Sequence, residues 1–119
     1  MTPRDIAAAA ATLWGEARGE EADGRQAVWH VIQNRAAARR QTIEQVCHAP
    51  KQFSCWNIGD PNRPGCEAIE RAVLDVLTVT ADPTQGAQHY CTVDTEPAWA
   101  RGLTACVTIG KHKFFNNVP

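Results

Sequence analysis

Apolar side chains recur every three or four residues over residues 6–14, close to the start of the chain. That spacing places them on one face of a helix and predicts that this face is buried. The helix has a favourable start, because Thr2 can cap it and Pro3 suits its first position. We expect it to end between Gly15 and Gly19, since glycine weakens helical structure.

The same periodicity predicts three more helices. A long one covers about residues 21–40, and a short one follows Thr42, whose hydroxyl can cap it. A fourth covers residues 67–80, where apolar residues again share one face. Residues 50–65 contain several prolines and glycines, which predicts an irregular loop between the third and fourth helices.

The pattern changes in the last third of the chain. Residues 89–93 and 103–109 are short stretches rich in β-formers, which favour strands. With residues 110–115 they predict a small antiparallel sheet, held to the helices by Trp99 and Phe114 in the core. We therefore expect a single domain over residues 1–119 of the α+β class, mainly helical, with a small antiparallel sheet in its C-terminal part.

Composition limits the function more than the fold. The chain has 119 residues, 44% of them hydrophobic and 21% charged, with a formal net charge of −1. This balance is typical of a folded domain and gives no bulk attraction to nucleic acid or to a membrane. No apolar run approaches the length of a membrane span, and the N-terminus has no signal-peptide pattern. We expect the protein to be made in the cytoplasm and to reach any outside substrate by another route.

Cysteine is frequent and odd in number. At most two disulfides can form within the chain, and the sequence does not choose their pairing. Zinc is a competing explanation, but no two cysteines have the two-residue spacing that structural zinc sites favour. Buried, unpaired thiols are the third possibility. The five cysteines are Cys47, Cys55, Cys66, Cys91 and Cys106.

Glu16 is the first candidate for chemistry. It is expected at the end of an apolar helix, with Trp14 nearby and the small residues Gly15 and Ala17 on either side. A carboxyl group in a water-poor setting keeps its proton more readily, which suits a general acid, and the small neighbours leave room for a bulky substrate. From this stretch alone Glu16 can equally be a solvated helix-end charge, as most glutamates are.

A second candidate is the short stretch over residues 52–57 (QFSCWN) inside the predicted loop. It places amide and hydroxyl groups between two aromatic side chains, Phe53 and Trp56. Aromatic faces stack on sugar rings, while amides and hydroxyls bond to sugar hydroxyl and acetamide groups. The alternative is that both aromatic residues anchor the loop by packing into the core.

Six short motifs follow one another along the chain. They are residues 14–20 (WGEARGE), 26–28 with 34–35 (QAV and NR), 50–54 (PKQFS), 82–87 (DPTQGA), 97–99 (PAW) and 109–115 (IGKHKFF). In this order they resemble the spore cortex-lytic (SleB-like) family of bacterial and phage cell-wall hydrolases. The resemblance extends over nearly the whole chain, and the GEARGE piece is its most specific part.

The resemblance implies a lysozyme-like fold and cleavage of the β-1,4 bond between N-acetylmuramic acid and N-acetylglucosamine in peptidoglycan. It implies a lytic transglycosylase that leaves 1,6-anhydro-muramic ends, with Glu16 as general acid and then base, and without a metal or organic cofactor. Residues 88–90 (QHY) depart from the relatives. The chain also shows no signal peptide or peptidoglycan-binding repeat, which is more typical of a phage or phage-derived endolysin, released through a holin-type hole or carried on a virion.

Substrate-binding residues are expected where a family motif carries a polar or aromatic side chain. Arg18 could orient Glu16 or the lactyl carboxylate of the substrate, or form an ordinary surface ion pair. The other expected binding residues are Gln52, Phe53, Ser54, Tyr90 and His112.

Several alternatives remain open at this point. A hydrolytic muramidase would use the same site, and a usual glycosidase needs a second carboxylate across the scissile bond. The candidates for it are Glu20, Glu21, Asp60 and Asp94, none of them in a setting as apolar as that expected for Glu16. The chain could also be a non-catalytic glycan-binding module, or a small interaction protein stabilised by disulfides or zinc. We expect a monomer whose partner is the peptidoglycan glycan strand, with no nucleic-acid binding and no membrane insertion.

Overall fold

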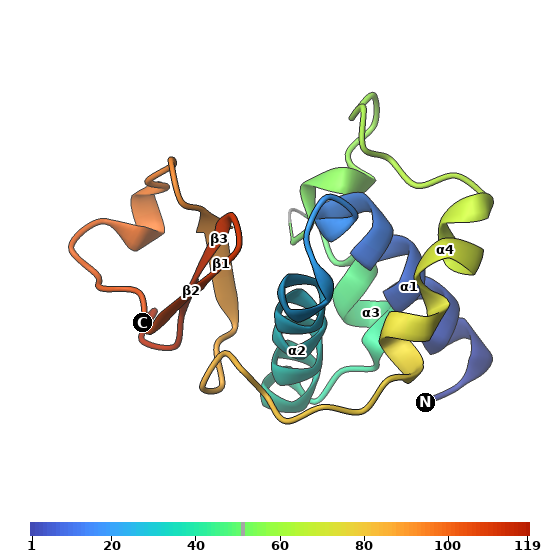
Figure 1. Ribbon diagram of the computed structural model, residues 1–119, viewed down its shortest axis with the longest axis horizontal. Helices are drawn as coiled ribbons and strands as arrows, with labels where there is room; N and C mark the ends of the chain where they lie inside the picture. Colours follow the sequence, from blue (N-terminus) through green and yellow to red (C-terminus); the bar gives the residue numbers. More distant parts are fainter. Residues whose placement is uncertain (51) are drawn as a thin grey trace.

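The protein consists of a cluster of helices and a small sheet that lies beside it (Figure 1). The computed structural model describes residues 1–50 and 52–119. The main helices are α1 (Pro3–Ala17), α2 (Ala22–Arg39), α3 (Ile43–His48) and α4 (Glu67–Leu77). The strands are β1 (His89–Thr92), β2 (Val107–Ile109) and β3 (His112–Phe115), and two short 3-10 turns are η1 (Ser54–Trp56) and η2 (Ala98–Ala100).

Helix α1 is the centre of the helical part, in contact with α2, α3 and α4. Its run of alanines is almost fully buried, and these small side chains allow the other helices to pack closely. The predicted start is confirmed, because Thr2 caps the helix and Pro3 occupies its first turn. The predicted end is confirmed: the helix passes through Gly15 and ends at Ala17, between the two glycines, so Glu16 lies in its last turn.

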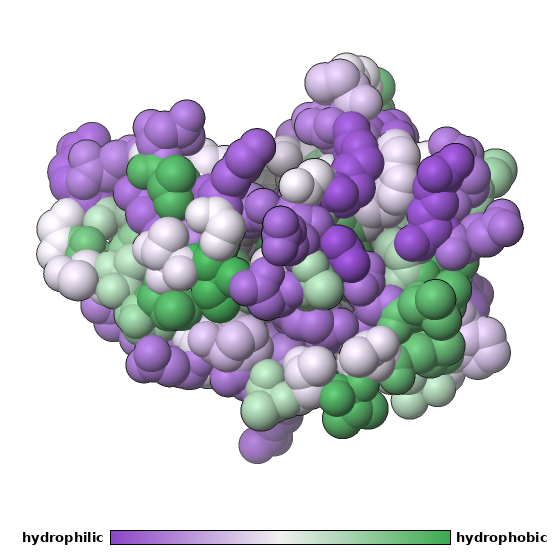
Figure 2. Space-filling view, in the orientation of Figure 1, coloured by the Kyte–Doolittle hydropathy of each residue, from purple (hydrophilic) through white to green (hydrophobic). Residues whose placement is uncertain are grey.

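The other helices agree with the predicted order. Helix α3 begins after Thr42, whose side chain accepts a hydrogen bond from Gln45 N–H. Helix α4 ends at Leu77 and not at residue 80, because Thr80 leaves the helix and bonds to Gln26 of α2. Apolar side chains, including the exposed Leu74, gather over the C-terminal half of α4 (Figure 2).

The sheet is antiparallel, as predicted, with strand order β1-β3-β2. Strand β2 is shorter than the predicted 103–109, since before Val107 the described backbone bonds to β3 at a single position, from Cys106 N–H to Phe114 O. Phe114 is fully buried and packs into the helical core, as predicted. Trp99 is half-buried and packs edge-on against Phe115, which ties η2 to the sheet.

The five cysteines, all within the described residues, are free thiols in the structure. Cys47 and Cys55 are buried, and burial raises the pKa of the Cys47 thiol to about 11. Among the described residues, no group of three or more His, Cys, Asp or Glu is placed to hold a metal ion. No helix in the described part of the chain is both long and apolar enough to span a membrane.

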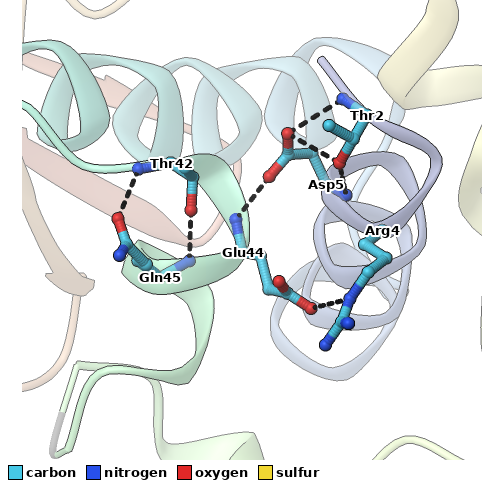
Figure 3. Close-up of polar contacts among 6 residues, drawn as sticks. All are labelled: Thr2, Arg4, Asp5, Thr42, Glu44 and Gln45. Carbon is cyan, nitrogen blue, oxygen red and sulfur yellow. Dashed lines mark hydrogen bonds and ion pairs between the residues drawn. The ribbon is translucent and has the colours of Figure 1, made fainter.

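Asp5 connects the start of α1 to the start of α3 (Figure 3). Its carboxylate accepts hydrogen bonds from Thr2 N–H at 2.9 Å and from Glu44 N–H at 3.0 Å. These backbone hydrogen bonds, from Thr2 first and then from Glu44, lower the pKa of Asp5 below its ordinary value. The carboxylate form is therefore the one that stabilises the fold.

We predict that Asp5→Ala lowers the free energy of unfolding by about 1–2 kcal/mol at neutral pH, because two helix starts lose an acceptor. A lowered pKa in the folded state means that the contribution is complete above the unfolded pKa and is lost as the pH falls through the folded pKa. The difference between wild type and variant should shrink below about pH 4. Urea unfolding as a function of pH measures it, and a difference that stays constant down to acid pH would contradict this role.

Candidate active site

A cleft of about 420 Å³ lies between the helical part and the sheet. Its walls come from the end of α1, the middle of α2, the loop before α4, and strands β1 and β3. The lining residues are Gly15, Glu16, Arg35, Gln52, Ser54, Asn62, Tyr90, Cys91, Thr92 and His112. The motifs that are separated in sequence thus meet around one cavity.

Glu16 projects from the last turn of α1 and is held by three hydrogen-bond donors. Tyr90 donates its hydroxyl to Glu16 Oε1 at 2.5 Å. On the other oxygen, Glu16 Oε2 accepts the Cys55 backbone N–H at 3.1 Å and, more weakly, the Ser54 hydroxyl at 3.5 Å. Both oxygens therefore have defined positions before any substrate is present.

Close packing beneath the helix brings these donors to Glu16. A Cβ atom added to Gly15 would lie 2.6 Å from Cys55 Cβ and 3.0 Å from the Asn62 carbonyl oxygen. Only a residue without a side chain lets the loop approach α1 so closely. Gly15 therefore has a packing role, and the Cys55 N–H reaches the carboxylate because of it.

The predicted apolar setting of Glu16 is wrong. Trp14 does not line the cleft, because side chains two positions apart on a helix point to different faces. Instead the Arg18 guanidinium lies 4.2 Å above the indole ring of Trp14, in a separate pocket. The surroundings of the Glu16 carboxylate are polar and hydrogen-bonded.

Tyr90 is suited to be a lasting hydrogen-bond partner of Glu16. Burial and, after it, the negative charge of Glu16 raise the pKa of Tyr90 well above its ordinary value. The phenol thus keeps its proton at any physiological pH. Its ring packs edge-on against His112 at a centroid distance of 5.0 Å and near Phe114, which fixes the direction of the hydroxyl.

The sequence reasoning missed a buried pair behind the cleft, formed by Glu20 and His112. Glu20 was considered only as a candidate second carboxylate, but its side chain is 8% exposed and faces the sheet. Its Oε1 accepts the Lys111 backbone N–H at 2.8 Å and lies 3.1 Å from His112 Nδ1. The ring nitrogen makes no hydrogen bond among the described residues, so the two side chains are in close polar contact only. Glu20 therefore braces the turn that carries His112.

His112 is held in a neutral-favouring environment. Burial lowers the pKa of His112, and the nearby negative charges of Glu20 and Glu16 oppose that effect only in part. The turn before it depends on Gly110, which has a φ of +59° and lies against the Glu20 carboxylate. In the sequence, only Glu20 in the GEARGE piece pointed to this arrangement. The residue that donates to it, Lys111, lies 91 residues later.

Glu16 is the only carboxylate among the described residues that line the cleft. The candidates for a second one lie elsewhere: Glu21 precedes α2, and Asp60 bonds to the backbone of its own loop. Glu20 is buried behind His112, and Asp94 follows β1 outside the cleft. In the part of the chain that the structure describes, no pair of carboxylates faces across the cavity.

Four of the predicted binding residues, Gln52, Ser54, Tyr90 and His112, line the cleft together with Glu16. The structure corrects the prediction that Phe53 binds substrate. Its side chain is 2% exposed, lies in the core under a guanidinium, and cannot reach a substrate. Arg18 lies outside the main cleft, in a shallow hollow that it shares with Glu16. Its guanidinium donates a hydrogen bond to Asn62 Oδ1 at 2.6 Å, and the described residues include no ion pair between Arg18 and Glu16.

Arg35 is a cleft residue for which the sequence predicted no role, although it belongs to the NR motif of residues 34–35. It is 6% exposed, donates to Gln88 O at 2.5 Å and to Gln52 O at 3.4 Å, and lies 4.8 Å above the Phe53 ring. It thereby joins α2 to both walls of the cleft. Asn62, Cys91 and Thr92 also line the cavity and had no local signal.

Comparison with known proteins agrees with this site. Residues 19–115 match the family described as Cell Wall Hydrolase, and the chain belongs to that family. It is 36% identical over 115 residues to a spore cortex-lytic enzyme of Halalkalibacterium halodurans and 33% identical over 113 residues to that of Bacillus subtilis. These alignments cover 94% and 92% of this chain but only 34% and 37% of the relatives. The chain thus spans little more than a third of the length of these two relatives.

Two solved structures have the same fold. The catalytic domain of Bacillus cereus SleB superposes with a TM-score of 0.76 at 32% identity, covering 96% of this chain and 91% of that one. The catalytic domain of a germination-specific lytic transglycosylase, SleB of Bacillus anthracis, gives the same TM-score and identity, with coverages of 97% and 96%. The predicted family and fold class are confirmed. The phage origin stays a prediction.

Proposed function

We propose that this chain cleaves the β-1,4 bond between N-acetylmuramic acid and N-acetylglucosamine in peptidoglycan, as a lytic transglycosylase that leaves 1,6-anhydro-muramic ends. The observation that carries the proposal is the single carboxylate of the cleft, Glu16. A usual glycosidase needs two carboxylates across the bond, whereas an intramolecular displacement needs only one acid that later acts as a base. The match to a lytic transglycosylase domain in sequence and fold supports the same reaction.

The reaction uses one proton twice. Protonated Glu16 gives its proton to the glycosidic oxygen, the bond from that oxygen to C1 of the muramic residue breaks, and the acetamide of the substrate stabilises the positive charge on C1. The deprotonated Glu16 then takes the proton of the muramic 6-hydroxyl as that oxygen bonds to C1. Glu16 is thereby reprotonated, no water is consumed, and the new chain end is an anhydro sugar.

The three donors around Glu16 fit both of its roles. The Cys55 N–H can only donate, so it favours the carboxylate that forms as the proton leaves. The Tyr90 hydroxyl can donate to the carboxylate and can also accept a hydrogen bond from the protonated acid. The site therefore holds Glu16 in place in both protonation states.

Hydrolysis at the same site is the second candidate function, and the Glu20–His112 pair is the observation that favours it. His112 lines the cleft with a lowered pKa, so its neutral ring could take a proton from water. Glu20 would then stabilise the charged ring across 3.1 Å. This route predicts reducing muramic ends, and a non-catalytic glycan-binding module predicts no released fragments at all.

The basic test is incubation of the purified protein with purified peptidoglycan sacculi, followed by liquid chromatography and mass spectrometry of the soluble fragments. The proposal predicts disaccharide-based fragments that end in a 1,6-anhydro muramic residue and therefore have no reducing group. Fragments with reducing ends would support the hydrolytic alternative. The absence of soluble fragments from sacculi of several wall types would contradict both.

We predict that Tyr90→Phe lowers kcat about tenfold to a hundredfold with little change in KM, because a hydrogen bond to a charged group is worth about 1.5–3 kcal/mol. The ring and its packing against His112 are kept, so the thermal midpoint should change little. Steady-state kinetics on soluble glycan strands separate the two constants. An unchanged kcat would show that the hydroxyl has no part in the reaction.

A further inference from the structure

A second pocket, lined by arginines, lies on the other side of the C-terminal end of α1. It has a volume of about 360 Å³ and is formed where α1, α2 and α4 meet. We call it the arginine pocket. Its lining residues are Leu13, Trp14, Arg18, Arg25, Arg71, Ala72 and Asp75.

Among the described residues, two of its three guanidinium groups have no acidic partner. Arg25 donates to Asp75 at 2.8 Å, so this pair is close to neutral. Arg18 bonds only to neutral oxygens, those of Trp14 and Asn62. Arg71 has no ion pair or hydrogen bond within the described residues. The pocket thus presents two uncompensated positive charges beside an indole ring.

The arginine pocket is connected to the active site. A shallow hollow lined by Gly15, Glu16, Arg18, Gly19 and Asn62 shares Glu16 and Asn62 with the cleft. The same hollow shares Arg18 with the arginine pocket. The hollow thus adjoins both cavities, so a group attached to the sugar at Glu16 can extend over Asn62 and Arg18 toward Arg71.

We propose that the arginine pocket binds carboxylates of the peptide stem on the muramic residue whose bond is cleaved. This inference rests on the proposed function, since it concerns the same substrate. The glycan backbone itself is neutral, whereas the stem carries free carboxylates and starts at the lactyl group of the muramic residue next to the scissile bond. Guanidinium groups match carboxylates through paired hydrogen bonds, and Trp14 offers an apolar wall for the peptide.

The test compares two forms of the same glycan: strands free of teichoic acid that keep their peptides, and strands from which an amidase has removed them. The wild type should cleave the peptide-bearing strands about five to ten times more efficiently, the size expected for one or two partly exposed charge pairs. Arg71→Ala should bring this ratio close to one, and Arg71→Lys should keep part of it. High salt should also lower the ratio.

Arg101→Ala is the matched control, because it removes the same charge from an exposed position beyond η2, remote from both pockets. It should leave the ratio as in the wild type. A wild-type ratio near one, or an Arg71→Ala ratio equal to that of the wild type, would overturn the proposal. Failure to cleave either form would instead contradict the proposed function.

A binding measurement does not depend on turnover. The Glu16→Gln variant is titrated with the wall disaccharide that carries its peptide stem and, in parallel, with the disaccharide alone, while NMR follows the Trp14 indole N–H. In Glu16→Gln, the signal should move with the peptide-bearing ligand and not with the disaccharide alone. In the double variant that also carries Arg71→Ala, it should move with neither ligand. Equal shifts with both ligands would contradict a peptide subsite.

Discussion

Replacing Glu16 with glutamine is expected to reduce the release of wall fragments about a thousandfold or more, the range for loss of a general acid that also acts as base. Glutamine keeps the size of the side chain; its amide oxygen can still accept the Cys55 N–H, and its amide N–H can donate to the Tyr90 hydroxyl. Folding should therefore be retained, and the loss should appear in kcat. Fragment release from sacculi, with the thermal midpoint measured alongside, checks both statements.

The matched control is Glu21→Gln, the same substitution five positions along the chain. Glu21 precedes α2, is exposed and makes no capping hydrogen bond with its side chain. This variant should keep wild-type activity. If Glu16→Gln cleaved peptidoglycan as fast as the control, Glu16 would not be the acid, and the assignment of the site would fail.

Gly15→Ala is expected to lower the free energy of unfolding by about 1–3 kcal/mol, the usual cost of inserting a methyl group into a packed interior. The new Cβ would lie 2.6 Å from Cys55 Cβ, so the loop must move away from α1. That movement takes the Cys55 N–H away from Glu16, so activity should fall as well. Urea unfolding and the fragment assay measure the two effects separately.

Gly19→Ala serves as the control for this substitution. A Cβ at that position would meet no atom within 4 Å, and its backbone is not in the left-handed region. Its stability should lie within about 0.5 kcal/mol of the wild type. If Gly15→Ala were equally neutral in stability and activity, close packing under Glu16 would not explain how the site is built.

The helices could be predicted because their signals are local. Apolar spacing in α1 and α4 and the capping threonine before α3 each depend on a few neighbouring residues. Boundaries were less accurate, because tertiary contacts decide them. Helix α4, for example, ends at Leu77 and not at the predicted residue 80, and Thr80 bonds instead to Gln26 of α2.

The candidate site was predicted mainly from the motifs. Glu16 and His112 come from two separate motifs, and Gln52 and Ser54 share a third. Tyr90 lies in the 88–90 stretch that departs from the relatives, and all five residues line one cleft. The type of a motif residue did not show whether its side chain faces the cleft or the core. Phe53 was assigned to the substrate, yet it lies in the core because the guanidinium of a neighbouring helix covers its ring.

Contacts between distant segments were beyond the sequence. Glu20 reaches Lys111 and His112 from the other end of the chain, and no spacing rule connects them. Arg35 had the periodicity of a core helix residue, while its charged end extends to two backbone carbonyls on opposite walls of the cleft. In both cases a buried charge is stabilised by partners that only the fold brings near.

The central claim is that a single carboxylate, Glu16, cleaves the glycan without water. The most direct test is digestion of purified peptidoglycan in water labelled with the heavy isotope of oxygen, followed by mass spectrometry of the new muramic ends. The account predicts anhydro ends that contain no label and that are absent with Glu16→Gln. Reducing muramic ends that carry the label would show that water is the nucleophile and would contradict it.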